Sequence, residues 1–117
     1  MALNSKAKGA RFERHLASRL REYGYDARRG QQYCGANGDA DVVGLPHLHI
    51  EAKHVERLNL YDAMAQSIRD ARSGEIPVVM HKKNKTDILV SLMFDDFMQM
   101  YREWEASMFL KGDESNE

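Results

Sequence analysis

The sequence predicts a single α/β domain in which helices flank a mixed five-stranded sheet. The chain has 117 residues, which is enough for one hydrophobic core but not for two. Its predicted elements follow the order α-β-β-β-α-β-β-α, which is typical of a sheet with helices packed on its faces. The segments DVVGL and IPVVM are apolar enough to be strands covered on both sides. We assign residues 1–110 to this domain and residues 111–117 to a disordered acidic tail.

Three segments show apolar residues at the three- and four-residue spacing of one helix face. They span residues 5–23, 60–72 and 95–109, and Gly24 ends the first of them. The predicted apolar faces consist of Phe12, Leu16, Leu20 and Tyr23; of Leu60, Met64, Ile68 and Ala71; and of Phe97, Tyr101, Trp104 and Met108.

Five further segments have the composition of strands. Residues 26–33 form a weak, exposed candidate, and residues 40–44 and 48–53 are joined by a short turn around Pro46. Residues 76–81 and 87–93 are separated by the polar turn KKNKT.

Composition excludes several classes of protein. The chain is 43% hydrophobic and 30% charged, and it has no apolar run of the roughly 20 residues that a membrane span requires. The start of the chain lacks the apolar segment of a signal peptide. The single cysteine, Cys34, rules out an internal disulfide and fits a reducing cytoplasm.

The net charge of −1 hides an asymmetric distribution. Residues 1–32 hold eight Lys and Arg against three acids, whereas residues 95–117 hold seven acids against two bases. A basic front of this kind is either a footprint for phosphates or a solvated helix face. Candidate phosphate contacts are Lys6, Lys8, Arg11, Arg14, Arg28 and Arg29, with Lys82 and Lys83 in the later basic turn.

The most informative stretch is GDADVVGLPHLHIEAK, at residues 38–53. Asp41 and Glu51 would lie on neighbouring antiparallel strands, where side chains on one face are about 5 Å apart. Two carboxylates at that distance repel each other unless a proton or a cation lies between them. Oxygen ligands suit Mg²⁺ or Mn²⁺. Lys53 points to the same side as Glu51, where its amine can act on a water or on phosphate oxygens.

Glu13 is a further candidate, because it lies at the edge of the buried stripe of the first helix and could face the sheet. The alternative is a glutamate at the rim, paired with Arg14 or Arg28. Together, Glu13, Asp41 and the Glu51-Ala52-Lys53 triplet resemble the PD-(D/E)XK nuclease superfamily. The surrounding segments KGARFERHLASRLREYGYDARRG, DADVV, IEAK and IPVVMHKKN resemble the archaeal-type Holliday junction resolvases and their phage relatives over residues 8–97. Ala40 departs from the proline in the motif name.

The resemblance implies a restriction-endonuclease-like fold and a metal-dependent endonuclease. Asp41 and Glu51 would hold the metal, Glu13 would complete its shell, and Lys53 would serve the attacking water. Gln66 is similar to a glutamine on the following helix of these enzymes, and its position off the apolar face leaves open whether it reaches the site. The expected cofactor is Mg²⁺, with Mn²⁺ as a substitute.

The expected substrate is branched DNA, the four-way junction, recognised by shape and phosphates. Two opposed cuts by a domain with one site imply a homodimer. Met98 and Phe109 fall outside the apolar stripe of the last helix, so we expect part of this helix, together with sheet-edge residues, to contact a partner chain. The alternative is an ordinary core helix with a few exposed methionines. Alternative functions are cleavage of flaps, nicks or duplex DNA, and catalytically silent DNA binding.

Other polar residues in and near the hairpin have simpler interpretations. Asp39 could assist a metal, but an aspartate flanked by glycine in a loop is more often a turn former. His47, His49 and His54 do not have zinc-ligand spacing, and we expect them on the surface. His81 either touches phosphate or lies at the sheet edge.

Overall fold

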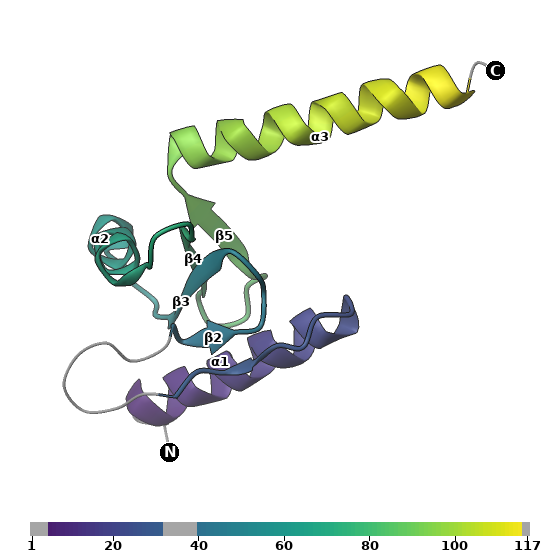
Figure 1. Ribbon diagram of the computed structural model, residues 1–117. Helices are drawn as coiled ribbons and strands as arrows, with labels where there is room; N and C mark the ends of the chain where they lie inside the picture. Colours follow the sequence, from purple (N-terminus) through teal and green to yellow (C-terminus); the bar gives the residue numbers. More distant parts are fainter. Residues whose placement is uncertain (1–4, 32–39, 116–117) are drawn as a thin grey trace.

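The computed structural model describes residues 5–31 and 40–115, and its element order is the predicted one (Figure 1). Asp39 and Cys34 lie outside the described residues. The elements are α1 (Ser5–Glu22), β1 (Arg28–Arg29), β2 (Val42–Val43), β3 (Leu48–His54), α2 (Leu60–Asp70), β4 (Ile76–Lys82), β5 (Leu89–Leu92) and α3 (Phe94–Ser115).

The described strands form one mixed sheet in the order β1-β2-β3-β4-β5. The pair β3–β4 is parallel and spans seven residue pairs, whereas the other three neighbouring pairs are antiparallel. The chain between β3 and β4 passes through α2, as a parallel connection requires. The predicted mixed five-stranded sheet is therefore confirmed.

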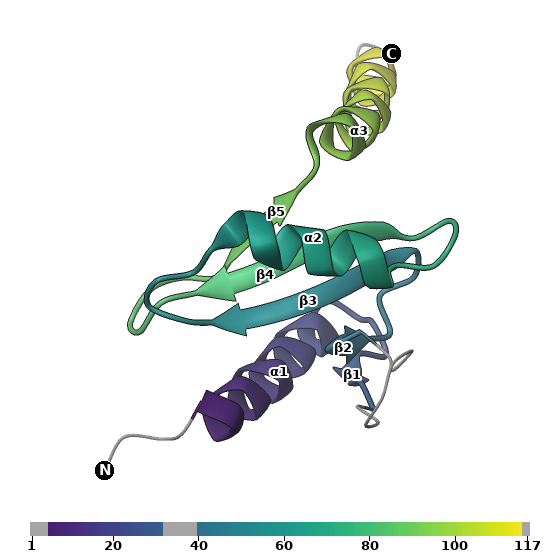
Figure 2. The ribbon, with the colours of Figure 1, turned by 90° about the vertical axis from the view of Figure 1, so that its left-hand side faces the viewer.

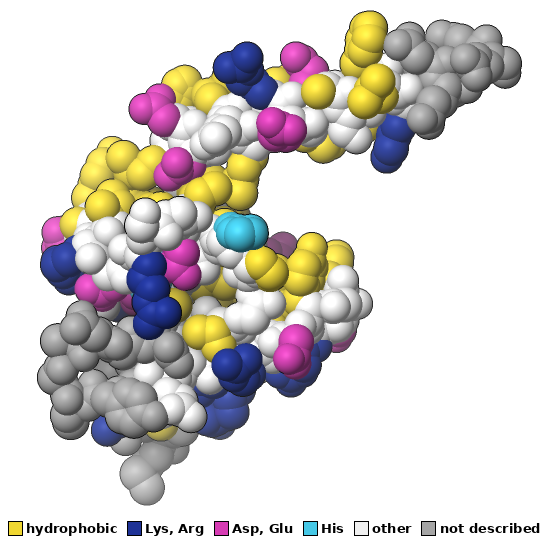
Figure 3. Space-filling view, viewed as in Figure 1, with side chains coloured by type: hydrophobic (Ala, Val, Ile, Leu, Met, Phe, Trp, Pro, Cys, Tyr) yellow, Lys and Arg dark blue, Asp and Glu magenta, His cyan; other side chains and the backbone are white. Residues whose placement is uncertain are grey.

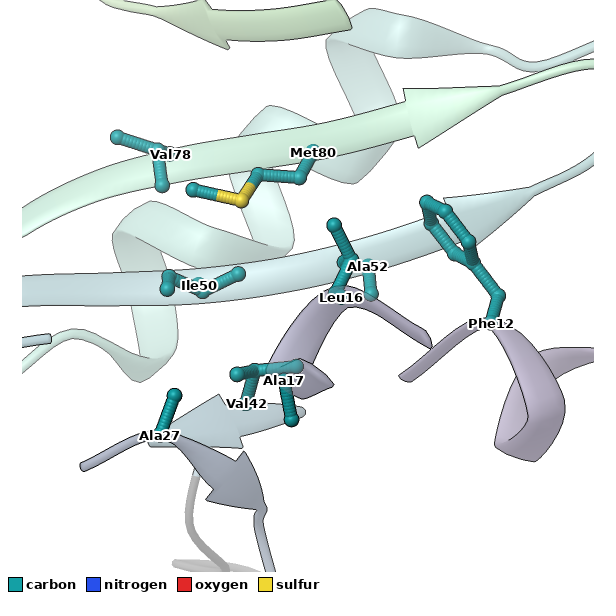
Figure 4. Close-up of a cluster of buried hydrophobic side chains, with 9 residues drawn as sticks. All are labelled: Phe12, Leu16, Ala17, Ala27, Val42, Ile50, Ala52, Val78 and Met80. Atoms are coloured by element: carbon teal, nitrogen blue, oxygen red, sulfur yellow. The ribbon is translucent and has the colours of Figure 1, made fainter. Parts of the chain in front are cut away.

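Helices α1 and α2 cover opposite faces of the sheet (Figure 2). Alternation along the central strands explains this, because successive side chains of a strand point to opposite faces. On the α1 face, Phe12 and Leu16 pack with Ile50 and Ala52 (Figure 4). On the α2 face, Ala63 and Met64 pack against Val79. The central strands are thus covered on both sides, as their apolar sequences predict.

The buried face of α2 differs from the predicted one. Ser67 is fully buried, whereas Ile68 is 47% exposed. The hydroxyl of Ser67 lies within hydrogen-bond distance of the backbone carbonyls of His49 and Val78, at 3.2 and 3.1 Å. A serine that bridges two strands in this way satisfies its own polar group in the core, so apolar spacing alone misplaces the face.

The turn between β2 and β3 is held close to the preceding segment. Gly44 has a φ of +103°, and a Cβ there would overlap the carbonyl oxygen of Asp26 and lie 2.7 Å from the Cα of Ala27. Only glycine fits this close approach. The segment that precedes β1 is thereby held against the turn between β2 and β3.

Helix α3 contradicts the expectation that its apolar stripe packs on the sheet. Figure 1 shows it extending away from the sheet after β5. The exposed fractions of Phe97, Tyr101, Trp104 and Met108 are 50%, 37%, 59% and 44%. The helix also continues to Ser115, beyond the expected end at residue 109 and into the segment that we expected to be a tail. Among the described residues, the buried clusters contain no side chain of α3.

Candidate active site

The site is built where β2 separates from β3. The two strands pair at Val42 and Ile50, and the backbone N–H of Asp41 then donates to the carbonyl of Ile50 at 3.0 Å. The carboxylate of Asp41 accepts a hydrogen bond from the backbone N–H of Ala52 at 2.9 Å. Asp41 is therefore attached to β3 by its main chain and by its side chain, next to Glu51.

Glu51 is the most buried acid of the site, with 3% of its surface exposed. Burial is the largest cause that raises the pKa of Glu51, because it disfavours the charged carboxylate. The Asp41 carboxyl raises this pKa further through charge repulsion and a side-chain hydrogen bond, whereas the hydrogen bond with His49 lowers it. The two predicted metal-binding carboxyl groups thus come together.

Glu13 joins them from α1. It is 7% exposed, and its Oε2 lies 3.5 Å from Nε of Arg29 on β1. Burial raises the pKa of Glu13, and the charges of Asp41 and Glu51 raise it too, while Arg29 lowers it. Glu13 therefore lies close enough to Asp41 and Glu51 for their charges to act on it, and its partner is Arg29 rather than Arg14 or Arg28.

Lys53 and Gln66 meet beside the acids. Lys53 is two residues after Glu51 on β3, so both side chains point to the α2 face. Its Nζ donates a hydrogen bond to Oε1 of Gln66 at 3.3 Å. Gln66 thus reaches the site, which its position on the helical wheel left open.

His49 is the residue that we misplaced. It is 4% exposed, not at the surface, and its Nε2 lies 3.0 Å from Oε1 of Glu51. The hydrogen bond with Glu51 is the largest cause that raises the pKa of His49. One signal in the sequence could have found it, since a residue two before Glu51 on a strand shares its face. His47 is exposed and His54 is half-buried.

The donor set fits a divalent cation. The carboxyl group of Asp41 raises the pKa of both Glu13 and Glu51, and such repulsion is relieved when a cation lies among the three groups. A second grouping overlaps this one, in which His49, Glu51 and Asp70 offer ligand atoms that all lie within 4.8 Å of one another. Both groupings share Glu51, so Glu51 is the centre of the candidate metal site.

Five of the candidate phosphate contacts lie on α1 and on the edge strand β1. Lys6, Arg11 and Arg14 are exposed on α1, and Arg28 and Arg29 are exposed on the edge strand β1. Figure 3 shows Lys and Arg side chains over the α1 end of the molecule.

The remaining candidate phosphate contacts are Lys8 on α1, Lys82 at the end of β4 and Lys83 directly after it. Lys8 and Lys82 approach His54 closely enough that their charges add to burial in lowering its pKa. Lys83 is exposed in the following turn.

No helix of the described residues is long and apolar enough to cross a membrane.

Comparison with solved structures agrees with this geometry. The chain is similar to Hjc from Archaeoglobus fulgidus, a Holliday junction resolvase from an archaeal hyperthermophile. The TM-score is 0.58 with 28% identity, over 72% of this chain and 76% of that chain. The shared fold is the restriction-endonuclease-like mixed sheet that the sequence predicts. No curated protein matches the chain.

The family comparison covers almost the whole chain. The model described as phage putative PDDEXK endonuclease matches residues 4–113. This range includes all the acids of the site, Lys53, Gln66 and most of α3. With the mixed sheet, the clustered carboxyl groups and a resolvase among its structural neighbours, the chain belongs to the phage PD-(D/E)XK endonuclease family of metal-dependent nucleases.

Proposed function

We propose that this protein is a Holliday junction resolvase, which hydrolyses phosphodiesters at four-way DNA junctions by paired cuts. The observation that carries the proposal is the convergence of Glu13, Asp41 and Glu51 beside the Lys53–Gln66 pair. The likeness to Hjc, which is itself a resolvase, supports the choice of substrate. The products would carry 5′-phosphate and 3′-hydroxyl ends.

Each residue of the site has a role that its position allows. Asp41 and Glu51 would hold Mg²⁺, for which Mn²⁺ could substitute, and Glu13 would complete the ligand shell. When bound, the cation supplies a Lewis acid that polarises the scissile phosphate and lowers the pKa of a water. Lys53 would orient the attacking water or stabilise charge on the phosphate oxygens. Gln66 accepts a hydrogen bond from Lys53 and would keep its amine at the site.

Paired cuts require two sites, and we propose that α3 joins two copies of the chain. Phe94, Phe97, Tyr101, Trp104 and Met108 recur at alternating spacings of three and four residues, which is the seam of a coiled coil. All five are exposed, by 37% to 65%. The rings of Phe97 and Tyr101 stack at 6.2 Å, and those of Tyr101 and Trp104 lie 5.7 Å apart. We call these five residues the α3 seam.

A second copy of the chain is the occupant that we propose for the α3 seam. An antiparallel twofold pair of α3 helices would supply the twofold symmetry that paired cuts require. Met98 and Phe109, 37% and 69% exposed, flank the seam and widen the apolar surface. The neighbouring edge strand β5 adds Leu89 and Val90, 61% and 53% exposed, as sheet-edge residues of the same interface.

Cleavage assays on matched substrates test the proposal. The purified protein is given a four-way junction or a linear duplex of the same sequence, with Mg²⁺ or with EDTA. We expect Mg²⁺-dependent, symmetric cuts in the junction and little cutting of the duplex. Cutting of flaps, nicks or duplex with the junction left intact would identify a different nuclease. Junction binding that Mg²⁺ never converts into cutting would identify a silent DNA-binding module.

A further inference from the structure

We propose that His49 is the positioning residue for Glu51 in the metal site, an inference that rests on the proposed function. Nε2 of His49 lies 3.0 Å from Oε1 of Glu51, and both groups are nearly completely buried. A hydrogen bond in the core has no water to replace it, so its geometry is maintained. With one oxygen of Glu51 held by His49, the carboxyl group can turn its other oxygen to a cation that it shares with Asp41.

The backbone of His49 is itself held by helix α2, which covers one face of the sheet. Its carbonyl is within hydrogen-bond distance of the Ser67 hydroxyl on α2, which also reaches the carbonyl of Val78 on β4. Ser67 therefore connects α2 to both central strands at the point where the imidazole begins. The backbone of His49 is therefore fixed by packed secondary-structure elements.

Distances also determine which ring nitrogen faces which acid. Nδ1 of His49 lies 3.8 Å from Oε1 of Glu75, which is beyond hydrogen-bond range, whereas Nε2 is within range of Glu51. Glu51 would be ionised as a metal ligand, and an ionised carboxylate only accepts hydrogen bonds, so Nε2 would then donate to it. On the Nδ1 side, a cavity of about 270 Å³ is lined by His49, Asp70, Arg72 and Glu75 among others. Buried histidines or carboxylates that orient a ligand in this way typically change metal affinity when they are replaced.

A second geometry competes with this one. The ligand atoms of His49, Glu51 and Asp70 all lie within 4.8 Å, so His49 could in principle be a ligand itself. Asp70 is exposed on α2, however, and Asp41 is attached to β3 beside Glu51 on the side away from His49. The two geometries differ in one measurable property, which is whether a nitrogen atom is bonded to the metal.

Metal titration of four variants tests the inference. Isothermal titration calorimetry with MnCl₂ alone is carried out on the wild type and on His49→Gln, His49→Asn, His49→Leu and Asp41→Asn. A glutamine amide reaches the position of Nε2, whereas an asparagine amide stops near the position of Nδ1. We expect His49→Gln to bind Mn²⁺ within about threefold of the wild type, and His49→Asn and His49→Leu to bind about 10–100-fold more weakly. Thermal melting without metal shows which variants are folded, and the polar Asn variant keeps the comparison valid if the Leu variant is not.

The outcomes separate this inference from the proposed function. If Asp41→Asn loses Mn²⁺ binding while His49→Asn keeps wild-type affinity, the metal site is correct and the role of His49 is wrong. If Asp41→Asn keeps wild-type affinity, the cation binds elsewhere and both are wrong. Pulsed electron paramagnetic resonance of the Mn²⁺ complex adds a direct signature. Coupling of Mn²⁺ to a histidine nitrogen that disappears in His49→Gln would make His49 a ligand and overturn its role as a positioning residue.

Discussion

Nζ of Lys53 donates a hydrogen bond of 3.3 Å to Oε1 of Gln66, and this contact connects β3 to α2 beside the Glu51 carboxyl group. An ammonium group has three hydrogens, so one is committed to Gln66 and the others remain for a water or a phosphate oxygen. A glutamine side chain thereby determines where the amine of Lys53 lies.

The first prediction follows from this contact. Gln66→Leu should lower the rate of Mg²⁺-dependent junction cleavage by roughly 10–100-fold, because a displaced amine is poorly aligned with the reacting phosphate. The affinity for Mn²⁺ should not change, since Gln66 is not part of the carboxyl cluster. Single-turnover cleavage and calorimetry measure the two quantities, and Gln99→Leu on the exposed α3 is the control. A wild-type cleavage rate in Gln66→Leu would remove Gln66 from the site.

The second prediction concerns stability without metal. The pKa of Glu51 is raised by burial, so the folded state favours its protonated form. The stabilisation from this shift is fully present below pH 4.5, which is the usual pKa of a glutamate. It is lost as the pH rises through the raised pKa of Glu51. Glu13 has a pKa shift of the same sign. In EDTA, the melting temperature of Glu51→Gln should therefore rise relative to that of the wild type as pH increases from 4.5 toward 8.

The shifted pKa values of three histidines also affect how the melting temperatures of the wild type and Glu51→Gln change with pH. The pKa values of His54 and His81 are lowered by burial, so their contribution is present above pH 6.5 and is lost below it. The wild type and Glu51→Gln both contain His54 and His81, so this opposite trend cancels in the difference between their melting temperatures. The pKa of His49 is raised, mainly by its hydrogen bond with Glu51, so its contribution has the sign of the Glu51 effect and is lost in the variant. A difference in melting temperature that is constant with pH would contradict the raised pKa of Glu51.

The third prediction concerns DNA affinity. If β1 follows the phosphate backbone, Arg28→Ala should lower the slope of log K against log salt by about 0.9. Arg29→Ala should lower it less, because Nε of Arg29 already lies 3.5 Å from Glu13. Arg19→Ala removes the same charge from α1, but Arg19 is paired with Glu22 at 3.4 Å, so this variant is the control. Fluorescence anisotropy with a labelled junction gives the slopes. An unchanged slope in the Arg28→Ala, Arg29→Ala double variant would show that β1 points away from DNA.

The fourth prediction concerns the α3 seam. Tyr101→Glu together with Trp104→Glu should convert a dimer into a monomer at micromolar concentration, because two charges would be buried in the interface. Gln99→Glu with Ala106→Glu adds the same charge to the opposite side of the helix and should leave the dimer intact. Light scattering coupled to gel filtration gives the mass. If the seam variant keeps the wild-type dimer affinity, the interface lies elsewhere.

The sequence was informative where a local pattern determines the structure. The order of elements follows from hydrophobic periodicity, and the pairing of Asp41 with Glu51 follows from a short hairpin whose strands must be neighbours. The shared face of Glu51 and Lys53 follows from the alternation of side chains along a strand.

What could not be predicted depends on contacts between distant segments. An apolar stripe such as that of α3 requires a hydrophobic partner, but it does not say whether this partner belongs to the same chain. The orientation of α2 depends on Ser67, whose hydroxyl reaches the carbonyls of two strands that are distant in sequence. His49 appeared to be a surface residue because its burial is produced by α2 and by the segment around Glu75. Each of these features is produced by tertiary contacts, so local sequence patterns could not predict it.

The central claim is that Asp41 and Glu51 form the metal site of a nuclease. The most direct test measures junction cleavage and junction binding by Asp41→Asn in the presence of Mg²⁺. Cleavage should fall by about 10³-fold or more, because a metal ion contributes several kcal/mol of transition-state stabilisation. Binding should be unchanged or tighter, since one negative charge facing the phosphates is removed. Wild-type cleavage by Asp41→Asn would contradict the assignment of the site.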